Sequence, residues 1–286
     1  MRTTSSHLES LLEDFTHYLR RKDLSSNTII SYLFSVRLFF SQHQKLTPEN
    51  LRTFYSFLIT NYLPASANQR IHSLNHFLLF LDECHPEIFP AVHHYHLPAI
   101  KLCRNSFRDQ VISNDDCQIL QRKLKQDGEL FWYFIVRFLV TTGVRVSELT
   151  KIKVEHLDCG YLDLYSKGGK VRRIYITDSL CREALDWCNS IGRNSGFIFL
   201  SRNGQPITSR GIQFQLKHFA QRYQLNPDTV YPHSFRHRFA KNFLYRCDDI
   251  ALLADLMGHE SIETTRIYLT RSCKEQQTLL NDIVTW

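Results

Sequence analysis

The chain has 286 residues, 43% hydrophobic and 22% charged, a composition typical of a globular protein with a substantial buried core. Its most apolar run, residues 131–140, carries Arg137 and is about half as long as a membrane span, so we expect no membrane association. The formal net charge of +7 favours a polyanionic partner such as nucleic acid, although charge alone does not identify one.

The cysteines and the first residues argue against a disulfide-stabilised secreted protein. None of the eight cysteines forms a Cys-x-x-Cys pair. The N-terminal residues, which include Glu9, Glu13 and Asp14, lack the apolar region of a secretory signal. We therefore expect reduced thiols in a cytoplasmic protein.

Residues 1–97 predict a domain of four helices. Apolar residues recur at helical spacing through each of them, and three of the four starts carry a capping residue or a first-turn proline. The predicted helices run at about 6–21, from Ser25 or Ser26 through Phe40, from Thr47-Pro48 to about Tyr62, and from Pro64 through Leu81.

Three prolines, Pro86, Pro90 and Pro98, crowd the segment after the fourth helix, which therefore cannot continue as one helix. We place a linker at 98–110 and a second domain at 111–286.

His93, His94 and His96 form a small cluster near the end of the first domain. No cysteine or carboxylate lies at metal-ligand spacing from them, so we interpret the cluster as a solvated segment rather than a metal site. The sequence thus predicts no bound metal and no other cofactor.

The second domain is predicted as mixed. Ser113 and Asp116 have the spacing of a capping box that opens a helix, and a more fully buried helix follows at about 129–140. Two β-rich runs flank a glycine turn, which predicts a hairpin at 161–176. Further helices are expected at about 178–190 and 208–223. The whole chain is therefore predicted as mainly α with a small β-sheet, an α+β fold.

Pro232 predicts the start of a further helix. His233 and Arg236 then share one face of its first turn, at a helix N-terminus that favours a phosphate. Phenylalanines at every fourth position give the same helix an apolar stripe for the core.

A break follows the next short helix, which we expect to be capped by Asp248 and to end at Gly258. Ser261 caps another helix, which we expect to carry Tyr268. One continuous helix would place His259 and Tyr268 about half a turn out of phase, so the break allows both side chains to converge.

Three blocks in this order resemble the tyrosine recombinases, or phage integrase family, and most closely their compact Xer-like members. They read Thr-Gly-Val-Arg-Val-Ser-Glu-Leu at 142–149, His-Ser-Phe-Arg-His at 233–237 and Leu-Met-Gly-His-Glu-Ser-Ile-Glu-Thr-Thr-Arg-Ile-Tyr at 256–268. Residues 24–32 and 66–74 resemble, more loosely, the family's helical, SAM-like core-binding domain. The resemblance implies that the second domain is catalytic.

The resemblance also implies a nucleophile and a clamp for a phosphate. Tyr268 would attack DNA and form a 3′-phosphotyrosyl intermediate without metal or ATP. Arg145 and Arg236 would hold the non-bridging phosphate oxygens with their planar donor forks. Glu148 lies three residues after Arg145, close enough on a helical turn to orient it.

The resemblance implies proton-transfer roles for two further residues and a hydrogen-bonding role for a third. Lys167 would protonate the leaving 5′-oxygen, although Lys170 lies on the same turn and is expected to touch DNA. His233 would assist proton transfer at the tyrosine, and His259 would donate a hydrogen bond to the phosphoryl group.

The implied partner is double-stranded DNA with specific, inverted-repeat sites. Asn27, Thr28, Arg70 and His72 are candidate DNA contacts in the first domain. The family resemblance implies a homo-tetramer on synapsed DNA, a Holliday junction, and a cytoplasmic, nucleoid-associated protein. A second recombinase as partner stays open. The alternative functions are a type IB topoisomerase-like enzyme and a catalytically inactive DNA-binding regulator.

Residues 273–286 carry apolar side chains at helical spacing, which predicts a terminal helix. It either covers its own domain or, as in Xer-like relatives, docks on a neighbouring subunit. The sequence leaves both arrangements open.

Overall fold

The computed structural model describes residues 5–101, 111–165, 171–259, 261–266, 268 and 280–284. The chain divides into two compact units, Met1–Asn105 and Ser106–Trp286. The division falls inside the segment that we predicted as a linker, and most of that segment lies outside the described residues.

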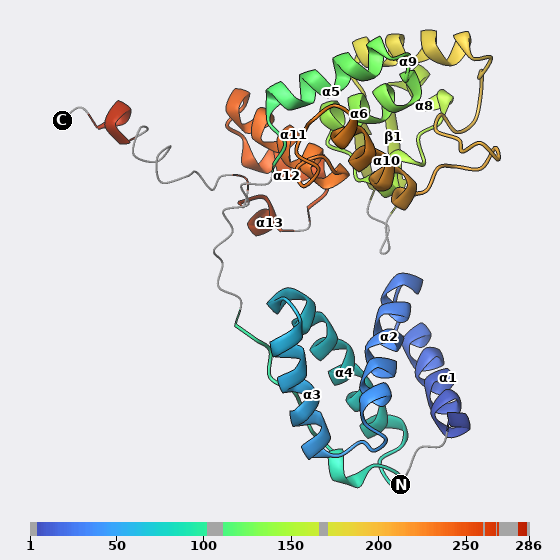
Figure 1. Ribbon diagram of the computed structural model, residues 1–286, viewed down its shortest axis with the longest axis vertical. Coiled ribbons are helices and arrows are strands. Elements are labelled where there is room, and N and C mark those ends of the chain that lie inside the picture. Colours follow the sequence, from blue (N-terminus) through green and yellow to red (C-terminus); the bar gives the residue numbers. More distant parts are fainter. Residues whose placement is uncertain are drawn as a thin grey trace. The chain divides into compact units, whose positions relative to one another are not determined.

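The first unit is a bundle in which α4 packs against the other three helices (Figure 1). Local hydrogen bonds explain two of the helix starts: the side chain of Ser25 accepts from the N–H of Thr28, and that of Thr47 from the N–H of Asn50. The elements are α1 (Ser5–Arg21), α2 (Ser26–Gln42), α3 (Pro48–Asn61), α4 (Pro64–Cys84) and the short η1 (Pro90–Val92).

Aromatic rings fill the centre of this bundle. The ring of Phe15 lies 5.1 Å from that of Phe77 and 5.2 Å from that of Phe80, between centroids. All three side chains are buried, and each contributes about 1.5–3 kcal/mol by its removal from water. The apolar spacing read from the sequence therefore marks the face that packs.

The second unit combines helices with one antiparallel pair of strands, which confirms the predicted mainly α class with a small β-sheet. Its elements are α5 (Asn114–Gln126), α6 (Leu130–Thr142), α7 (Val146–Leu149), α8 (Val154–Cys159), β1 (Tyr161–Tyr165), β2 (Val171–Tyr175), α9 (Asp178–Ser190), α10 (Ser209–Arg222), α11 (Pro232–Arg246), α12 (Ile250–Met257) and α13 (Ile262–Arg266).

The helix α6 is the buried centre of this unit, with apolar residues around most of its circumference. It packs against α5 and α11, and α11 in turn contacts α12. These contacts bring the C-terminal ends of α6 and α12 to α11. The candidate site lies where they meet.

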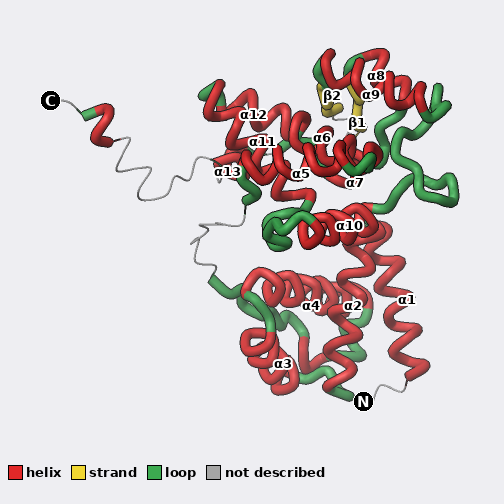
Figure 2. Tube along the Cα trace, turned by 45° about the horizontal axis from the view of Figure 1, so that its top comes forward, coloured by secondary structure: helices red, strands yellow, loops and turns green. Residues whose placement is uncertain are grey.

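The strands pair from Tyr161 opposite Tyr175 to Tyr165 opposite Val171. The sheet lies beside α8, as Figure 2 shows, and β2 also contacts α12. Residues 166–170, between the strands, lie outside the described residues. No helix in the described part of the chain is long and apolar enough to cross a membrane.

Two local predictions were wrong. The helix α12 is capped by Asp249 rather than Asp248, because Oδ1 of Asp249 accepts from the N–H of Leu252 at 2.9 Å. The helix α13 ends at Arg266, so Tyr268 lies in a turn after it, with its own N–H donating to the carbonyl of Thr265 at 3.0 Å.

Candidate active site

Gly143 ends α6 in the left-handed conformation, with φ at 61°. A Cβ at this position would overlap the ring of Phe239, so only glycine fits. The carbonyl of Gly143 accepts from Nη1 of Arg236 at 2.6 Å. The turn after α6 therefore presents a backbone acceptor to α11.

Arg236 is the largest of the fully buried side chains, with 1% of its surface exposed. Its Nη2 donates to the carbonyl of Met257 at 2.6 Å and lies 3.1 Å from Nε2 of His259. Both carbonyls that Arg236 binds belong to helix ends, where backbone acceptors lack intrahelical partners. One guanidinium group thus joins the ends of α6 and α12.

Two further arginines bind the same end of α12. Nη2 of Arg145 donates to the carbonyl of Gly258 at 3.0 Å, and Nη2 of Arg172 donates to that of Leu256 at 3.0 Å. The carbonyl between these two is the one that Arg236 holds. Three consecutive carbonyls therefore gather three guanidinium groups, and we call Arg145, Arg172 and Arg236 the arginine cluster.

Gly258 is required at this helix end for two reasons. Its φ of 60° lies in the left-handed region, and a Cβ there would overlap Cδ of Arg172. The helix break that the sequence predicted at Gly258 is confirmed. Because Gly258 has no Cβ, the side chain of Arg172 can pass it and reach the end of α12.

Glu148 is the counter-ion of the cluster. Its carboxylate accepts from Nη1 of Arg145 at 2.9 Å and Nη1 of Arg172 at 2.6 Å, and from the backbone N–H of Arg145 at 2.8 Å. Burial alone would raise the pKa of Glu148, but Arg172 and Arg145 outweigh it and hold the pKa below its usual value. The predicted contact between Glu148 and Arg145 is present.

The cluster keeps a surplus of positive charge. Among the described residues, Glu148 is the one carboxylate that accepts hydrogen bonds from the cluster, and it binds Arg145 and Arg172, whereas Arg236 donates to backbone carbonyls. Burial, together with the charges of Arg145 and Arg172, lowers the pKa of Arg236 to about 10, so it remains protonated at neutral pH. An anion is the ligand that such a site favours.

His259 is held in one tautomer. Its Nε2 lies against Nη2 of Arg236, and its Nδ1 lies 2.7 Å from Oγ1 of Thr265. Burial and the arginine cluster lower the pKa of His259 to about 4, so the ring is neutral at pH 7. Because a guanidinium group only donates, Nε2 accepts and the proton lies on Nδ1.

Tyr268 is buried and lies between two imidazoles. Its ring is stacked with that of His259, with centroids 6.1 Å apart and planes 14° apart, and it meets His237 edge-on at 4.9 Å. The predicted convergence of His259 and Tyr268 is therefore present. The ring of His237 also contacts that of the exposed His233, with centroids 4.5 Å apart. His237 therefore lies between His233 and Tyr268.

Burial raises the pKa of Tyr268, and Arg236 and Arg145 oppose this only in part. The hydroxyl is therefore protonated at neutral pH. Chemistry at this oxygen requires a base, or a change in surroundings that favours the phenolate.

Two residues that shape the site, Arg172 and His237, were not predicted from the sequence. Arg172 was available as an arginine on the second strand of the hairpin, but its partners Leu256 and Glu148 are distant in sequence. His237 was visible in the His-Ser-Phe-Arg-His block, four residues after His233 and on the same helix face.

The other predicted residues belong to the first unit or lie outside the described residues. Lys167 and Lys170 lie outside the described residues. In the first unit, Arg70 lies over the rings of Tyr62 and Phe34, 4.3 and 5.1 Å from their centroids.

The remaining candidates of the first unit differ in their surroundings. Oγ1 of Thr28 lies 2.8 Å from Oγ of Ser25, within the N-terminal cap of α2. Asn27 is exposed at the rim of a hollow of about 310 Å³, and His72 lies on the exposed face of α4.

An open groove of about 1100 Å³ borders the cluster. Five basic or imidazole side chains line it: Arg145, Lys151, Arg172, Arg173 and His259. Such a groove presents donors to an extended, anionic ligand.

Fold and site together define a mainly helical protein with a cluster of arginines beside a buried tyrosine. The profile of the phage integrase family matches residues 111–275. This span is more than half of the chain, and the chain belongs to that family, the tyrosine recombinases.

Relatives of known name agree with this assignment. The chain is 27% identical over 288 residues to tyrosine recombinase XerC of Leptospira interrogans, covering 94% of this chain and 91% of the relative. It is 25% identical over 307 residues to a tyrosine recombinase of Agathobacter rectalis, covering 98% and 96%.

Solved structures share the fold. The XerH recombinase bound to a palindromic difH substrate matches with a TM-score of 0.70 at 17% identity, over 97% of this chain and 84% of that one. A lambda integrase tetramer bound to a Holliday junction matches with a TM-score of 0.70 at 20% identity, over 93% and 78%.

Proposed function

We propose that this protein is a site-specific DNA recombinase that breaks and rejoins strands through a 3′-phosphotyrosyl intermediate. Membership of the tyrosine recombinase family supports recombination as the activity. The observation that carries the mechanism is the arginine cluster at the end of α12, beside the buried Tyr268.

In the proposed reaction the scissile phosphate binds Arg145 and Arg236 through its non-bridging oxygens. Oη of Tyr268 loses its proton and attacks phosphorus, and the bond from phosphorus to the 5′-oxygen breaks. Lys167 gives a proton to that oxygen. The 3′-phosphate is then joined to the tyrosine, and attack by the 5′-hydroxyl of another strand reverses the step without ATP.

The histidines have distinct roles in this proposal. His233 assists transfer of the tyrosine proton, and His237, whose ring contacts those of both His233 and Tyr268, positions them. His259 accepts from Arg236 in this structure, so its donation to a phosphoryl oxygen requires that Nε2 gain a proton. Negative charge builds up on the phosphate in the transition state. This charge lies next to the ring and favours protonation of His259.

The DNA partner and the assembly belong to the same proposal. Asn27, Thr28, Arg70 and His72 of the first unit contact one face of a specific, inverted-repeat site, and Lys170 contacts its backbone. Four copies act on two synapsed sites through a Holliday junction, the substrate on which the related lambda integrase tetramer was solved.

The terminal segment supports docking between copies. Leu280 is 55% exposed and Ile283 is 56% exposed, so these apolar side chains are not covered by their own unit. Residues 273–286 therefore dock on a neighbouring subunit in the proposed tetramer.

A two-stage experiment separates this function from its alternatives. The preferred site is first selected from random duplexes by the purified protein, and two copies are then placed on a supercoiled plasmid. Joined products with exchanged flanks are expected. Relaxed plasmid without exchange would indicate a topoisomerase, and binding with neither outcome would indicate an inactive regulator.

A further inference from the structure

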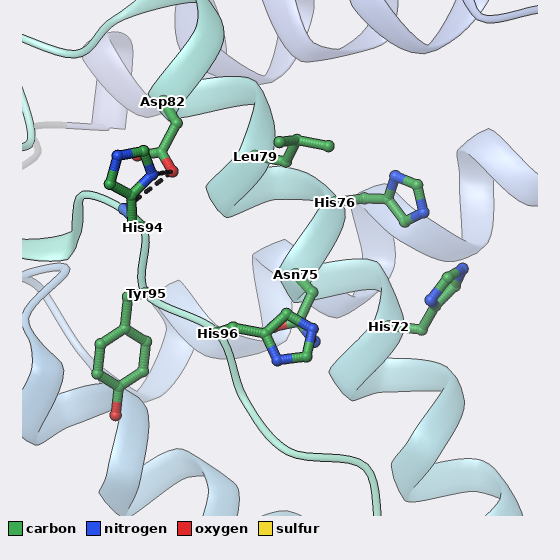
Figure 3. Close-up of a pocket in the computed structure, with 8 residues that line it drawn as sticks. All are labelled: His72, Asn75, His76, Leu79, Asp82, His94, Tyr95 and His96. Carbon is green, nitrogen blue, oxygen red and sulfur yellow. Dashed lines mark hydrogen bonds and ion pairs between the residues drawn. The ribbon is translucent and has the colours of Figure 1, made fainter.

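The first unit contains a histidine-rich pocket far in sequence from the tyrosine. It has a volume of about 380 Å³ and lies between α4 and the segment that follows η1 (Figure 3). Its lining includes four imidazoles and one carboxylate: His72, His76, Asp82, His94 and His96.

Asp82 lies at the base of a compact group of ligand atoms. Nδ1 of His93 is 2.9 Å from Oδ1 of Asp82, and Nδ1 of His94 is 3.6 Å from Oδ2. One ligand atom from each of the three residues lies within 4.8 Å of the others. Ligands about 2.0–2.2 Å from a tetrahedral ion are about 3.4 Å apart, so small adjustments bring all three atoms to coordination distance.

Consecutive side chains of an extended segment point to opposite sides, so His93 and His94 need a special backbone to face one carboxylate. His94 supplies it, because its φ of 54° lies in the left-handed region. Its backbone N–H donates to Oδ2 of Asp82 at 3.0 Å, and the two imidazole centroids are 3.8 Å apart. The turn therefore places both rings on the same side.

The group is open to an ion from solution. The side chain of Asp82 is 16% exposed, whereas those of His93 and His94 are 44% and 81% exposed. The carboxylate thus lies at the inner side of the group, and the two imidazoles lie on the side open to solvent. In Figure 3 the Asp82 carboxylate meets the His94 ring at one end of the pocket, and His72 lies further along α4.

We propose that Asp82, His93 and His94 bind one divalent transition-metal ion of the zinc class, with water as the remaining ligands. Two imidazoles and one carboxylate suit Zn²⁺, Ni²⁺ or Cu²⁺, whereas Ca²⁺ and Mg²⁺ require more oxygen ligands. The ion links the last turn of α4 to residues 93–101, through which the chain leaves the first unit. No metal site was predicted here from the sequence, because the carboxylate comes from the preceding helix and not from the histidine segment.

His96 is not part of this site. Its Nε2 lies 3.0 Å from Nδ2 of Asn75, which directs it away from Asp82. The site is therefore formed by two of the three histidines of the sequence cluster, with Asp82 as the added ligand.

Titration of the full-length protein with ZnCl₂ tests the proposal. Bound metal is first removed with EDTA and gel filtration, and binding is then followed by calorimetry and by competition with a chromophoric chelator. We expect a saturable site of one Zn²⁺ per chain and a higher melting temperature with the ion. Absence of saturable binding would overturn the proposal.

Substitutions assign the site. His94→Gln alters an exposed side chain, so the fold is expected to persist, and zinc affinity should fall by about tenfold or more. Asp82→Asn keeps an acceptor for the N–H of His94 and should weaken zinc equally. His72→Gln is the matched control, an exposed histidine of the same pocket, and should bind as the wild type does. Unchanged affinity in His94→Gln would assign the zinc to other groups and reject this site.

Discussion

Arg145 and Arg236 donate hydrogen bonds to the carbonyl oxygens of two consecutive residues, Gly258 and Met257, at 3.0 and 2.6 Å. The end of α12 therefore holds both guanidinium groups side by side. The partial negative charge of a helix C-terminus offsets their mutual repulsion. Each guanidinium has five N–H groups, so donors remain for a phosphate. The site therefore needs little reorganisation to bind one.

Arg172 is expected to position this pair rather than to contact DNA phosphate. Arg172→Ala removes the donors to Leu256 and Glu148, so cleavage of a bound site should slow by about 10- to 100-fold, as loss of an orienting partner typically does. Single-turnover cleavage at saturating protein measures this effect.

Arg173 provides the matched control for Arg172. It pairs with Asp163 at 2.7 Å, and it lies over the ring of Tyr161 at 3.8 Å. Arg173→Ala should leave the cleavage rate of saturated DNA within a few-fold of wild type. Equal losses in both variants would mean that Arg172 has no special positioning role.

Gly258 tests the helix break. Gly258→Ala adds a strained left-handed residue and a clash with Arg172, so we expect a stability loss of more than about 1–2 kcal/mol and loss of cleavage. Gly192→Ala is the control, because its φ is also positive but no atom lies within 4 Å of the added Cβ. It should lose about 1 kcal/mol in urea unfolding and keep full cleavage. Normal cleavage by Gly258→Ala would show that the break is dispensable.

His259 predicts a specific dependence of stability on pH. Its pKa is about 4 in the folded protein and about 6.5 in the unfolded chain, so below pH 6.5 the unfolded chain binds a proton that the folded protein does not. Its contribution to stability is therefore complete above pH 6.5 and is lost as the pH falls towards 4.

His259→Gln should flatten that loss between pH 6.5 and pH 5, above the range in which Glu148 titrates. Urea unfolding at both pH values, on wild type and variant, measures the difference. If the two proteins lose equal stability over this interval, His259 is not held neutral by the arginine cluster.

The sequence predicted those parts of the fold that depend on neighbouring residues. Caps at Ser25 and Thr47 use backbone groups three residues away, so local reading placed these helix starts within a residue or two. Gly258 was found for a similar reason, because its left-handed conformation ends a helix locally. Asp248 failed because two adjacent aspartates satisfy the same capping pattern, and only Asp249 is oriented to cap α12.

The parts that escaped prediction depend on distant contacts. Arg172 contacts Leu256 from a strand, and Asp82 contacts His93 and His94 from a helix. No residue spacing in the sequence indicates either contact. His237 was missed for a different reason. It belongs to a quoted block, but its contact with Tyr268 follows from the turn after α13.

The terminal segment tests the proposed assembly. Deletion of residues 273–286 should leave the melting temperature and single-site binding unchanged, while synapsis and recombination are lost. Leu280→Ser with Ile283→Ser should have the same effect, because both side chains are exposed in the single chain. A large fall in melting temperature together with lost single-site binding would show that the segment packs on its own unit.

The central claim is that Tyr268 is the nucleophile, and covalent capture tests it most directly. The selected site, nicked close to the scissile phosphate so that religation fails, is incubated with protein in EDTA and analysed on a denaturing gel. Wild type should form a protein–DNA adduct, and so should Tyr245→Phe, whose tyrosine is 92% exposed on α11. Tyr268→Phe should bind the same DNA and form none. An adduct that persists in Tyr268→Phe would contradict the account.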